Sequence, residues 1–180
     1  MRRAPRHAVN THHYHRYEDF GMPIEKDSVV SFHYRLSVGA EQVEDSHGGE
    51  PLSYLHGYGN IIAGLEHEMA GKSVGDSYTV TIAPELAYGP RRQDAIARVQ
   101  MKQVLTKGRL KAGMPITINT EHGPRQVRVI KPGKFVVDID ANHPMAGATL
   151  TFDIDVVEVR AASAEELAHG HVHGAGGHHH

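Results

Sequence analysis

Strict alternation of apolar and polar residues is the feature that most constrains how this chain can fold. Residues 29–38, VVSFHYRLSV, place apolar side chains on one face of an extended strand and polar ones on the other. The apolar face consists of Val30, Phe32, Tyr34, Leu36 and Val38. Residues 76–82 and 150–157 repeat the pattern. A period of two indicates antiparallel strands with one buried face, so the sequence predicts a small antiparallel sheet.

One helix is predicted between the first two of these strands. Its apolar stripe has four members at helical spacing: Ile61, Ile62, Leu65 and Met69. Asn60 is a suitable N-cap, and Gly71 stands where a left-handed residue commonly ends a helix. Gly64 lies inside the stripe, although glycine there costs roughly 1 kcal/mol relative to alanine. We therefore expect another element to approach the helix closely at Gly64, in an α+β fold whose sheet wraps around the helix.

The middle of the chain, residues 90–147, differs from the sequence on either side. Residues 91–111 are polar and basic, with a short helix predicted around residues 95–105. Three strand-like segments follow at 116–120, 126–130 and 135–140, separated by the turn signals EHGP and KPGK. Structureless loops of this length are rare inside compact domains. We therefore predict that residues 90–147 form an inserted, mostly antiparallel β domain.

The two ends of the chain have weaker patterns. Residues 1–21 are basic, lack the apolar stretch of a secretion signal and are predicted to be a disordered extension. From residue 161 the chain is predicted to be helical for a short stretch that includes ASAEELAHG (162–170), and it then closes on HGHVHGAGGHHH, with six histidines in twelve residues. Composition alone leaves two alternatives for this tail, a purification tag or a native metal-binding segment.

Composition and motifs narrow the classes of function. The 180 residues have a formal net charge of −2, so the overall charge does not predict nucleic-acid binding. The sequence has no cysteine, which excludes a thiolate nucleophile and a disulfide framework. No run of about 18 apolar residues predicts a membrane span, and a cytoplasmic location is expected. Motifs of serine hydrolases, phosphate-binding loops and helical zinc proteases are missing. The scattered histidines are predicted to be surface or turn residues: His56, His67, His122 and His143.

Seven apolar and aromatic residues are predicted to face inward: Leu52, Ile61, Ile62, Leu65, Tyr34, Tyr88 and Phe152. Periodicity alone favours a simple core for them. The two tyrosines add a second interpretation, because a buried tyrosine needs a partner for its hydroxyl. An apolar pocket with a few hydrogen-bonding groups would satisfy both interpretations.

Four strings resemble a known family. They are PLSYLHGYGNIIAGLEHEMAGKSVGD (51–76), APELAYG (83–89), NHPMAGATLTFDIDVVEVR (142–160) and EELAHGHVHG (165–174). In this order they resemble the FKBP-type peptidyl-prolyl isomerases, and more narrowly the bacterial SlyD group, over roughly residues 24–174. The resemblance implies an FKBP-like half-barrel built from residues 22–89 and 148–160. It also implies an insert-in-flap chaperone domain at 90–147 and a His-rich metal-binding tail at 161–180.

The resemblance implies a set of substrate-binding residues. Leu65 would form the floor of an apolar pocket for the prolyl ring, and Leu52 and Val43 would form its walls. Ile61 and Ile62 would stand at the entry of the helix, where a backbone amide of the family binds the substrate carbonyl.

The catalytic residues implied by the resemblance are three aromatic side chains and one acid. Tyr34, Tyr88 and Phe152 match the aromatic residues of the pocket. The family usually has an aspartate after the residue that matches Val43, whereas this chain continues with Glu44 and Asp45. Either Glu44 takes the place of that acid, or Asp45 does so after a shift of register.

The implied activity is peptidyl-prolyl cis-trans isomerisation, which needs no cofactor, combined with holding of unfolded or proline-containing polypeptide by the insert. The tail implies bound nickel, with zinc and copper as other ions that imidazole suits. Its candidate ligands are His169, His171, His173, His178, His179 and His180, of which the last three fit either a native ligand set or an appended tag. The alternative function is that of a nickel metallochaperone with secondary isomerase activity and metalloenzyme maturation proteins as partners. We expect a monomer with no nucleic-acid or membrane partner.

Overall fold

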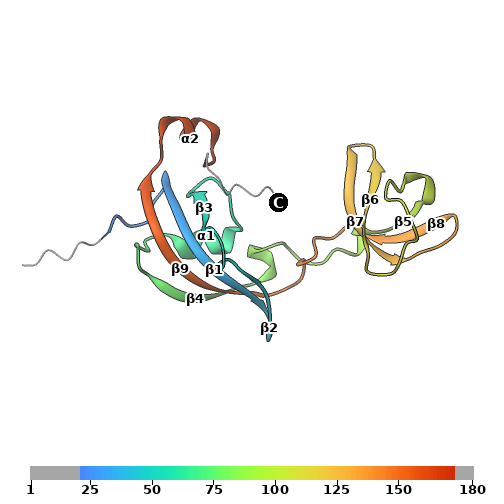
Figure 1. Cartoon of the computed structure of the whole chain (residues 1–180), viewed down its shortest axis with the longest axis horizontal. Helices are drawn as coiled ribbons and strands as arrows, with labels where there is room; N and C mark the ends of the chain where they lie inside the picture. The colour runs from blue at the N-terminus through green and yellow to red at the C-terminus, as the bar shows by residue number, and fades with distance from the viewer. Residues whose placement is uncertain (1–20, 173–180) are drawn as a thin grey trace, which may run out of the picture.

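The computed structural model describes residues 21–172, which form two antiparallel sheets joined by two connecting segments (Figure 1). The larger sheet has five strands: β1 (Ser28–Val38), β2 (Glu41–Asp45), β3 (Leu52–Leu55), β4 (Ser77–Ile82) and β9 (Leu150–Ala161). Their order is β2-β1-β9-β4, and β3 pairs with the first half of β1 while β2 pairs with the second half. The predicted strands at 29–38, 76–82 and 150–157 are therefore confirmed.

The core of this sheet follows the predicted alternation. The inward side chains of β1 and β9 are buried: Val30, Phe32, Leu36, Leu150, Phe152, Ile154 and Val156. Helix α1 (Ala63–Met69) adds Leu65 and Met69 to the same cluster, and the sheet curves around it (Figure 1). Burial of each such side chain contributes about 1.5–3 kcal/mol relative to exposure. The predicted α+β fold, a half-barrel around one helix, is confirmed.

Helix α1 begins two residues later than predicted, and the prediction that Asn60 is its N-cap is wrong. Ile62 holds the N-cap position, and its carbonyl accepts a hydrogen bond from the Glu66 amide at 3.0 Å. The Asn60 side chain is engaged elsewhere, because its Oδ1 accepts from the Leu55 amide at 3.2 Å and its Nδ2 donates to the Gly170 carbonyl at 3.0 Å. Asn60 therefore ties the end of β3 to the chain beyond β9.

The two glycines of this helical region behave as predicted. Gly71 follows the helix with a φ of 76°, in the left-handed region that glycine adopts most readily. A Cβ at Gly64 would overlap the Ile82 Cγ2 atom and would lie 3.1 Å from the Leu86 Cβ atom. The expected close approach therefore exists, and β4 and the turn after it make it.

Residues of the insert form the second sheet, which has four strands and its own core. The strands are β5 (Ile96–Gln100), β6 (Pro115–Thr120), β7 (Gly123–Lys131) and β8 (Val136–Asp140), in the order β5-β8-β7-β6. Seven buried residues form a cluster distinct from that of the barrel: Leu110, Ile116, Ile118, Val127, Val129, Val137 and Ile139. The three strands predicted in this region are confirmed, as is the mostly antiparallel character of the insert.

The helix predicted around residues 95–105 is wrong. Residues 96–100 form β5, and only single 3-10 turns flank it, at Gln93–Ala95 and Met101–Gln103. Val99 pairs with the fully buried Val137 of β8 and packs against the core of the insert. Pairing with a neighbouring strand therefore overrides the local sequence pattern, as tertiary context commonly does.

Two connecting segments, residues 83–95 and 141–149, run side by side between the sheets (Figure 1). The Gly147 amide donates to the Gly89 carbonyl at 2.8 Å. The Arg92 amide donates to the Asn142 Oδ1 atom at 2.8 Å, and the Asn142 Nδ2 atom donates back to the Arg92 carbonyl at 2.9 Å. The insert is therefore held by a pair of mutually hydrogen-bonded chains rather than by two independent tethers.

The last described element is α2 (Ala164–His169), which confirms the predicted short helix. Ser163 and Glu166 form a capping box, and the Glu166 carboxylate also accepts two hydrogen bonds from Arg160, at 2.9 and 2.7 Å. None of the helices in residues 21–172 has the length and apolar character that a membrane crossing requires. The predicted extension at 1–21, apart from residue 21, and the tail from residue 173 lie outside the described residues.

Candidate functional site

Three aromatic side chains from β1 and β9 meet at the edge of the barrel core. The Tyr34 ring is tilted by 46° against Phe32 at 5.9 Å between centroids, and by 55° against Phe152 at 6.0 Å. The register pairs Leu36 of β1 with Phe152 of β9, which makes Tyr34 and Phe152 diagonal neighbours on one face. Phe152 is buried and Tyr34 is half-buried. Tyr34 therefore lies between the apolar core and solvent.

The Tyr34 hydroxyl donates a hydrogen bond of 2.6 Å to Glu44 Oε1. Strand pairing sets this contact, because Glu44 of β2 lies opposite Leu36 of β1, two residues from Tyr34. Burial raises the pKa of Tyr34 above its ordinary value, and the hydrogen bond and negative charge of Glu44 raise it further. The Tyr34 phenol is therefore protonated at neutral pH, with its proton directed at the Glu44 carboxylate.

Asp45, the alternative acid, contacts the opposite face of the sheet. Its carboxylate accepts hydrogen bonds from Arg35 Nε at 3.2 Å and from the His47 amide at 2.9 Å, and it contacts His47 Nδ1 at 2.6 Å. The other ring nitrogen of His47 lies 2.7 Å from Asp155 Oδ2 on β9. Hydrogen bonds to Asp155 and then Asp45 raise the pKa of His47, while the bonds from His47 lower the pKa of Asp45 to about 2. His47 therefore fastens the loop after Glu44 to β9.

Tyr88 reaches this region from the first connecting segment. Its ring stacks on the ring of His143, with 3.9 Å between centroids and 2° between planes. Burial raises the pKa of Tyr88, and the negative charge of Glu44 adds to the rise, which places the phenol in the field of that carboxylate. His143 belongs to the second connecting segment, and its Nδ1 accepts a hydrogen bond from the Met145 amide at 3.0 Å.

His143 is the residue that sequence reasoning missed. It is exposed, as predicted for a surface or turn residue, but its contact with Tyr88 makes it part of the site. The available signal was positional, because Tyr88 and His143 lie shortly before and after the stretch that forms the second sheet.

Apolar side chains from α1 and β3 complete the site. Leu65 is buried in the barrel cluster, and Leu52, Ile61 and Ile62 are half-buried and pack against it. Val43 differs, because it is 42% exposed, lies at a bulge of β2 and is not among the side chains that pack on the cluster. Eight of the nine predicted site residues are thus joined by packing, by the Tyr34–Glu44 hydrogen bond or by the field of Glu44.

The arrangement offers an apolar surface bordered by two phenols that keep their protons at neutral pH. Such a surface can bind an apolar ring and can donate a hydrogen bond to a carbonyl oxygen, and neither task needs a nucleophile or a metal ion.

The predicted metal ligands are only partly described. His169 ends α2, and its ring stacks on His171 at 5.9 Å between centroids and 24° between planes. His173, His178, His179 and His180 lie outside the described residues. Within residues 21–172, no group of three or more His, Asp or Glu side chains could hold a metal ion.

A second apolar surface lies on the insert, where β5 ends and β8 begins. It is an open groove of about 410 Å³ lined by Gln100, Met101, Lys102, Lys134, Phe135 and Val136. The Met101 amide donates to the Phe135 carbonyl at 2.9 Å, which fixes the two sides of the groove. Phe135 is 73% exposed, whereas phenylalanine is mostly buried in folded proteins.

Comparison with known proteins assigns the family. Residues 21–157 match the family model described as FKBP-type peptidyl-prolyl cis-trans isomerase. The FKBP-type peptidyl-prolyl cis-trans isomerase SlyD of Vibrio cholerae is 45% identical over 157 residues, which cover 87% of this chain and 78% of that protein. SlyD of Aeromonas hydrophila is 41% identical, with 87% and 74% covered, and SlyD of Escherichia coli K12 is 39% identical, with 86% and 79% covered. The chain therefore belongs to the FKBP-type peptidyl-prolyl cis-trans isomerase family, within its SlyD group, and is a peptidyl-prolyl isomerase.

Proposed function

We propose that prolyl bonds isomerise at the surface formed by Tyr34, Tyr88, Phe152 and Leu65, and that the insert holds the unfolded polypeptide that contains those bonds. The two roles belong to two separate apolar surfaces, one on each sheet. The exposed groove around Phe135 is the observation that carries the second role.

Isomerisation at the first surface requires differential binding rather than acid–base chemistry. Rotation about a peptide bond costs about 18–20 kcal/mol because it breaks amide resonance. The twisted amide has lost its conjugation and much of its dipole, so an apolar environment stabilises it relative to the planar amide. Phe152 and Leu65 supply that environment for the prolyl ring.

The hydrogen-bonding groups orient the substrate. Tyr88 donates to the substrate carbonyl, and a backbone amide at Ile61–Ile62 binds a second carbonyl. Glu44 holds Tyr34 against Phe152 through the 2.6 Å hydrogen bond. The burial that raises the pKa of both tyrosines supports this role, because each phenol keeps its proton. Leu52 forms part of the apolar wall, and Val43, which is exposed, contacts the parts of the chain next to the proline.

Exposed apolar side chains on the insert support client holding, since Phe135 and Val136 are exposed and the half-buried Met101 lies beside them. Phe135, Met101 and Val136 line one groove, and an unfolded chain can bury its own apolar side chains there. Each apolar side chain removed from water contributes about 1.5–3 kcal/mol at most, so such binding is weak and reversible. Weak binding suits a protein that must release its client after the prolyl bond has isomerised.

A refolding assay separates the two roles. In the double variant Phe135→Ser/Met101→Ser, catalysed refolding of a protein limited by prolyl isomerisation should slow about tenfold, while turnover of a short prolyl peptide should stay at the wild-type value. Ile130→Ser is the matched control, because Ile130 is 41% exposed on β7 of the same insert but does not line the groove. Unchanged refolding in the double variant would remove the client-holding role.

Nickel binding by the C-terminal histidines is the second function proposed. The stacked pair His169–His171 supports it, because two neighbouring imidazoles at the end of α2 are suitable nickel ligands. The other four histidines would complete the set. The same ligands support the alternative function of a metal carrier that serves metalloenzyme maturation proteins, in which isomerisation is secondary.

Calorimetric titration with nickel tests this role. Truncation after Val172 keeps α2 and should lower the number of bound ions, and His169→Ala/His171→Ala in the truncated chain should abolish binding. His67→Ala on α1 is the control. Undiminished binding in the truncated double variant would remove the tail from the function.

A further inference from the structure

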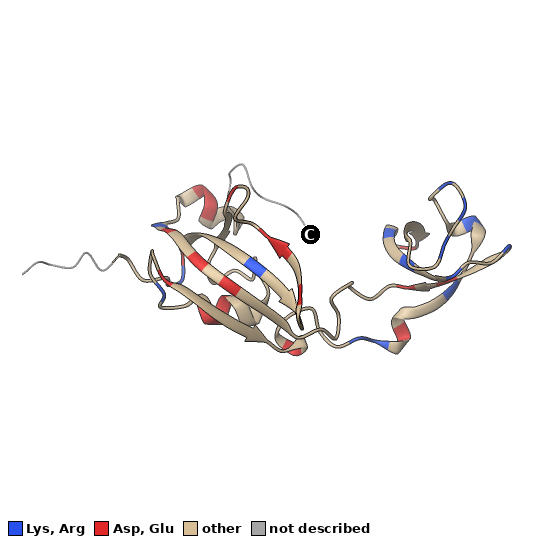
Figure 2. Ribbon diagram, turned by 60° about the horizontal axis from the view of Figure 1, so that its bottom comes forward, with Lys and Arg blue, Asp and Glu red and all other residues tan. Residues whose placement is uncertain are grey.

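We propose that the insert selects acidic segments of unfolded polypeptide, and this inference rests on the client-holding role proposed above. Formal charge is divided unequally between the two sheets. Residues 90–147 contain eleven Lys and Arg against four Asp and Glu, a formal charge of +7. The rest of the described chain, residues 21–89 and 148–172, contains four Lys and Arg against fifteen Asp and Glu, a formal charge of −11. Figure 2 shows this division along the ribbon, where Asp and Glu positions (red) predominate on the barrel and Lys and Arg positions (blue) on the insert.

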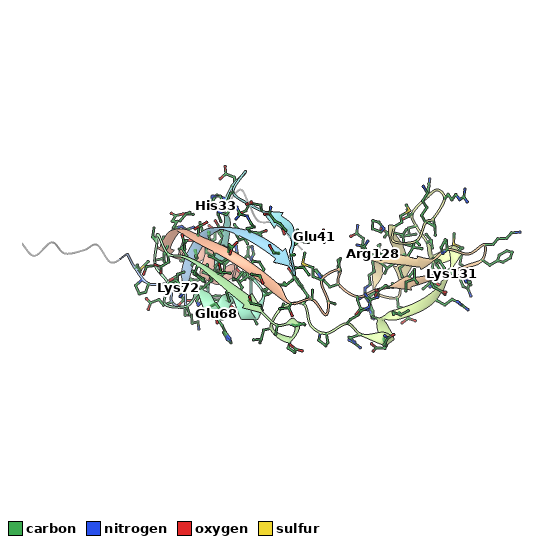
Figure 3. The ribbon with its side chains drawn as sticks, turned by 90° about the horizontal axis from the view of Figure 1, so that it is seen from below. His33, Glu41, Glu68, Lys72, Arg128 and Lys131 are labelled. Carbon is green, nitrogen blue, oxygen red and sulfur yellow. The ribbon has the colours of Figure 1, made fainter. Side chains whose placement is uncertain are left out.

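Most cations of the insert form no salt bridge within residues 21–172, although Arg128 and Lys131 lie in the fields of Asp140 and Asp138. Arg91 pairs with Asp140, Arg92 with Asp94, and Arg98 with Asp138. These pairs use three of the four acids of the insert. Eight cations remain that make no ion pair within residues 21–172: Lys102, Lys107, Arg109, Lys111, Arg125, Arg128, Lys131 and Lys134. All eight are exposed, and Figure 3 shows Arg128 and Lys131 on β7.

Part of this unpaired positive charge lies at the apolar groove of the insert. Lys102 and Lys134 line it together with Phe135, and the Lys134 Nζ atom lies 5.2 Å from the centroid of the Phe135 ring. A bound segment that places an apolar side chain on Phe135 therefore brings its neighbouring residues next to two ammonium groups. Carboxylates at those positions gain a partner, whereas lysine or arginine there would meet like charge.

The acidic barrel helps to decide whether the partner of the insert is a polypeptide or a nucleic acid. Polypeptide is favoured over nucleic acid because the groove offers methionine, valine and phenylalanine side chains, which suit apolar residues of a peptide. A phosphate backbone carries one charge at every residue, and the formal charge of −11 next to the insert would repel it. A polypeptide with one acidic segment can lie on the insert and keep neutral or basic residues near the barrel.

The proposal predicts a salt-dependent preference. The Debye length is about 30 Å at 10 mM salt and about 8 Å at 150 mM, so surface charges attract strongly only at the lower concentration. We therefore expect an acidic client segment to bind several times more tightly than a neutral one of the same shape at 10 mM salt. The ratio should shrink as salt is added.

The test uses three fluorescent, proline-free peptides of about 16 residues, each with one Phe and one Leu. They differ only at six positions, which are all Glu in the first peptide, all Gln in the second and all Lys in the third. Without proline they report on the insert rather than on the isomerase site. Fluorescence anisotropy with the full chain at 10 mM salt should give affinities in the order Glu, Gln, Lys, with at least about a fivefold step from Glu to Gln. In Lys102→Glu/Lys134→Glu the order should invert.

A matched control separates local from overall charge. Lys26→Gln/Lys72→Gln removes two cations from the barrel and should keep the wild-type order, whereas Lys102→Gln/Lys134→Gln should lose most of the preference for Glu. Circular dichroism of every variant checks the fold. Figure 3 shows Lys72 on the barrel, away from the groove.

The outcomes distinguish this inference from the client-holding role. Equal binding of the Glu and Gln peptides would overturn the charge preference and leave client holding intact. Failure of all three peptides to bind would overturn both. Tighter binding of a single-stranded oligonucleotide of similar length than of the Glu peptide would assign the basic face to nucleic acid. Association of the chain with itself at 10 mM salt, at the peptide's expense, would assign that face to the acidic barrel of a second copy.

Discussion

The ring of Tyr88 lies flat on the ring of His143, with 3.9 Å between their centroids. The two residues come from different connecting segments, and these segments also share the hydrogen bond from Gly147 to Gly89. Tyr88, unlike Tyr34, does not come from a strand of the barrel. Its ring is therefore held in place by the second connecting segment, which leads from the insert back to the barrel. The position of Tyr88 consequently depends on how the insert is attached.

His143→Ala should lower kcat/KM for a short prolyl peptide by about two- to tenfold. A stacked aromatic pair contributes about 0.5–1.5 kcal/mol beyond its buried area, and its loss leaves Tyr88 less well positioned. A protease-coupled peptide assay measures the effect. His122→Ala, in the β6–β7 turn of the insert, is the control and should be neutral. Wild-type activity in His143→Ala would show that the stack does not position Tyr88.

Tyr34 and Glu44 should act as a coupled pair. Tyr34→Phe and Glu44→Ala each remove one side of the 2.6 Å hydrogen bond, so the double variant should be little worse than either single variant. A hydrogen bond to a charged group contributes about 1.5–3 kcal/mol of stabilisation when it is buried. Because Glu44 is exposed to solvent, we expect a coupling energy of about 1 kcal/mol between the two residues. The measurement is kcat/KM in a double-mutant cycle. Simple additivity of the two losses would contradict the coupling.

Gly64→Ala should fail to stabilise the barrel although alanine is the better helix former. Alanine gains about 1 kcal/mol in helix propensity, but its Cβ would overlap Ile82 Cγ2, and overpacking of this kind costs about 1–3 kcal/mol. Urea unfolding should therefore show an unchanged or lower free energy of unfolding. In the Ile82→Ala background the same substitution should be less destabilising, because its closest contact is gone while Leu86 Cβ and the Leu86 carbonyl oxygen remain at 3.1 Å. A clear gain in the wild-type background would contradict the close approach.

His47 should make the stability of the barrel depend on pH. Asp155 and Asp45 raise its pKa, so its contribution is fully present below about pH 6.5, the value of an unperturbed imidazole, and is lost as pH rises through the raised value. The pKa values of both acids are lowered, so their contribution is lost only in acid, below about pH 4. The ring of His33 also faces His47, at 5.1 Å between centroids, and Arg35 binds Asp45.

Thermal unfolding of wild type and His47→Gln between pH 5 and 9 measures this dependence. The difference in Tm should be largest near pH 5–6 and should fall as pH approaches 9. His67→Gln, on the exposed side of α1, is the control and should give a difference that does not vary in the same way. A His47→Gln difference that grows with pH would contradict the assigned ion pairs.

The sheet and the helix of the barrel could be predicted because their signals are local. Alternation along β1, β4 and β9 depends only on which face of each strand is buried. The glycine inside α1, Gly64, indicated that another element packs closely against the helix. Asn60 was misassigned because its side chain binds the Leu55 amide, which precedes it, and the carbonyl of Gly170, which is distant in sequence, rather than the first turn of α1. A helix was predicted in place of β5 for the same reason, since β8, its pairing partner, follows about forty residues later.

The same distinction between local signals and distant contacts applies to the candidate site. Tyr34 and Phe152 could be placed on one face by alternation, but the choice between Glu44 and Asp45 depended on the register of β2 against β1, which has a bulge. The stack of His143 on Tyr88 depends on how the two connecting segments run together, and no periodic pattern encodes that arrangement. Resemblance to the family supplied the positions of Tyr88 and the α1 residues, which periodicity alone assigned to a simple core.

The order of the strands also determines when the isomerase can form. β9 lies between β1 and β4 in the middle of the larger sheet, yet it is the last strand in the sequence and follows the whole insert. A ribosome therefore releases β5 to β8, whose contacts are local, before the strand that completes the barrel. Sheets that depend on distant pairings fold slowly, and locally paired elements fold first. The surface proposed to hold unfolded chains can thus be in place while the catalytic half of the same molecule is still a folding chain.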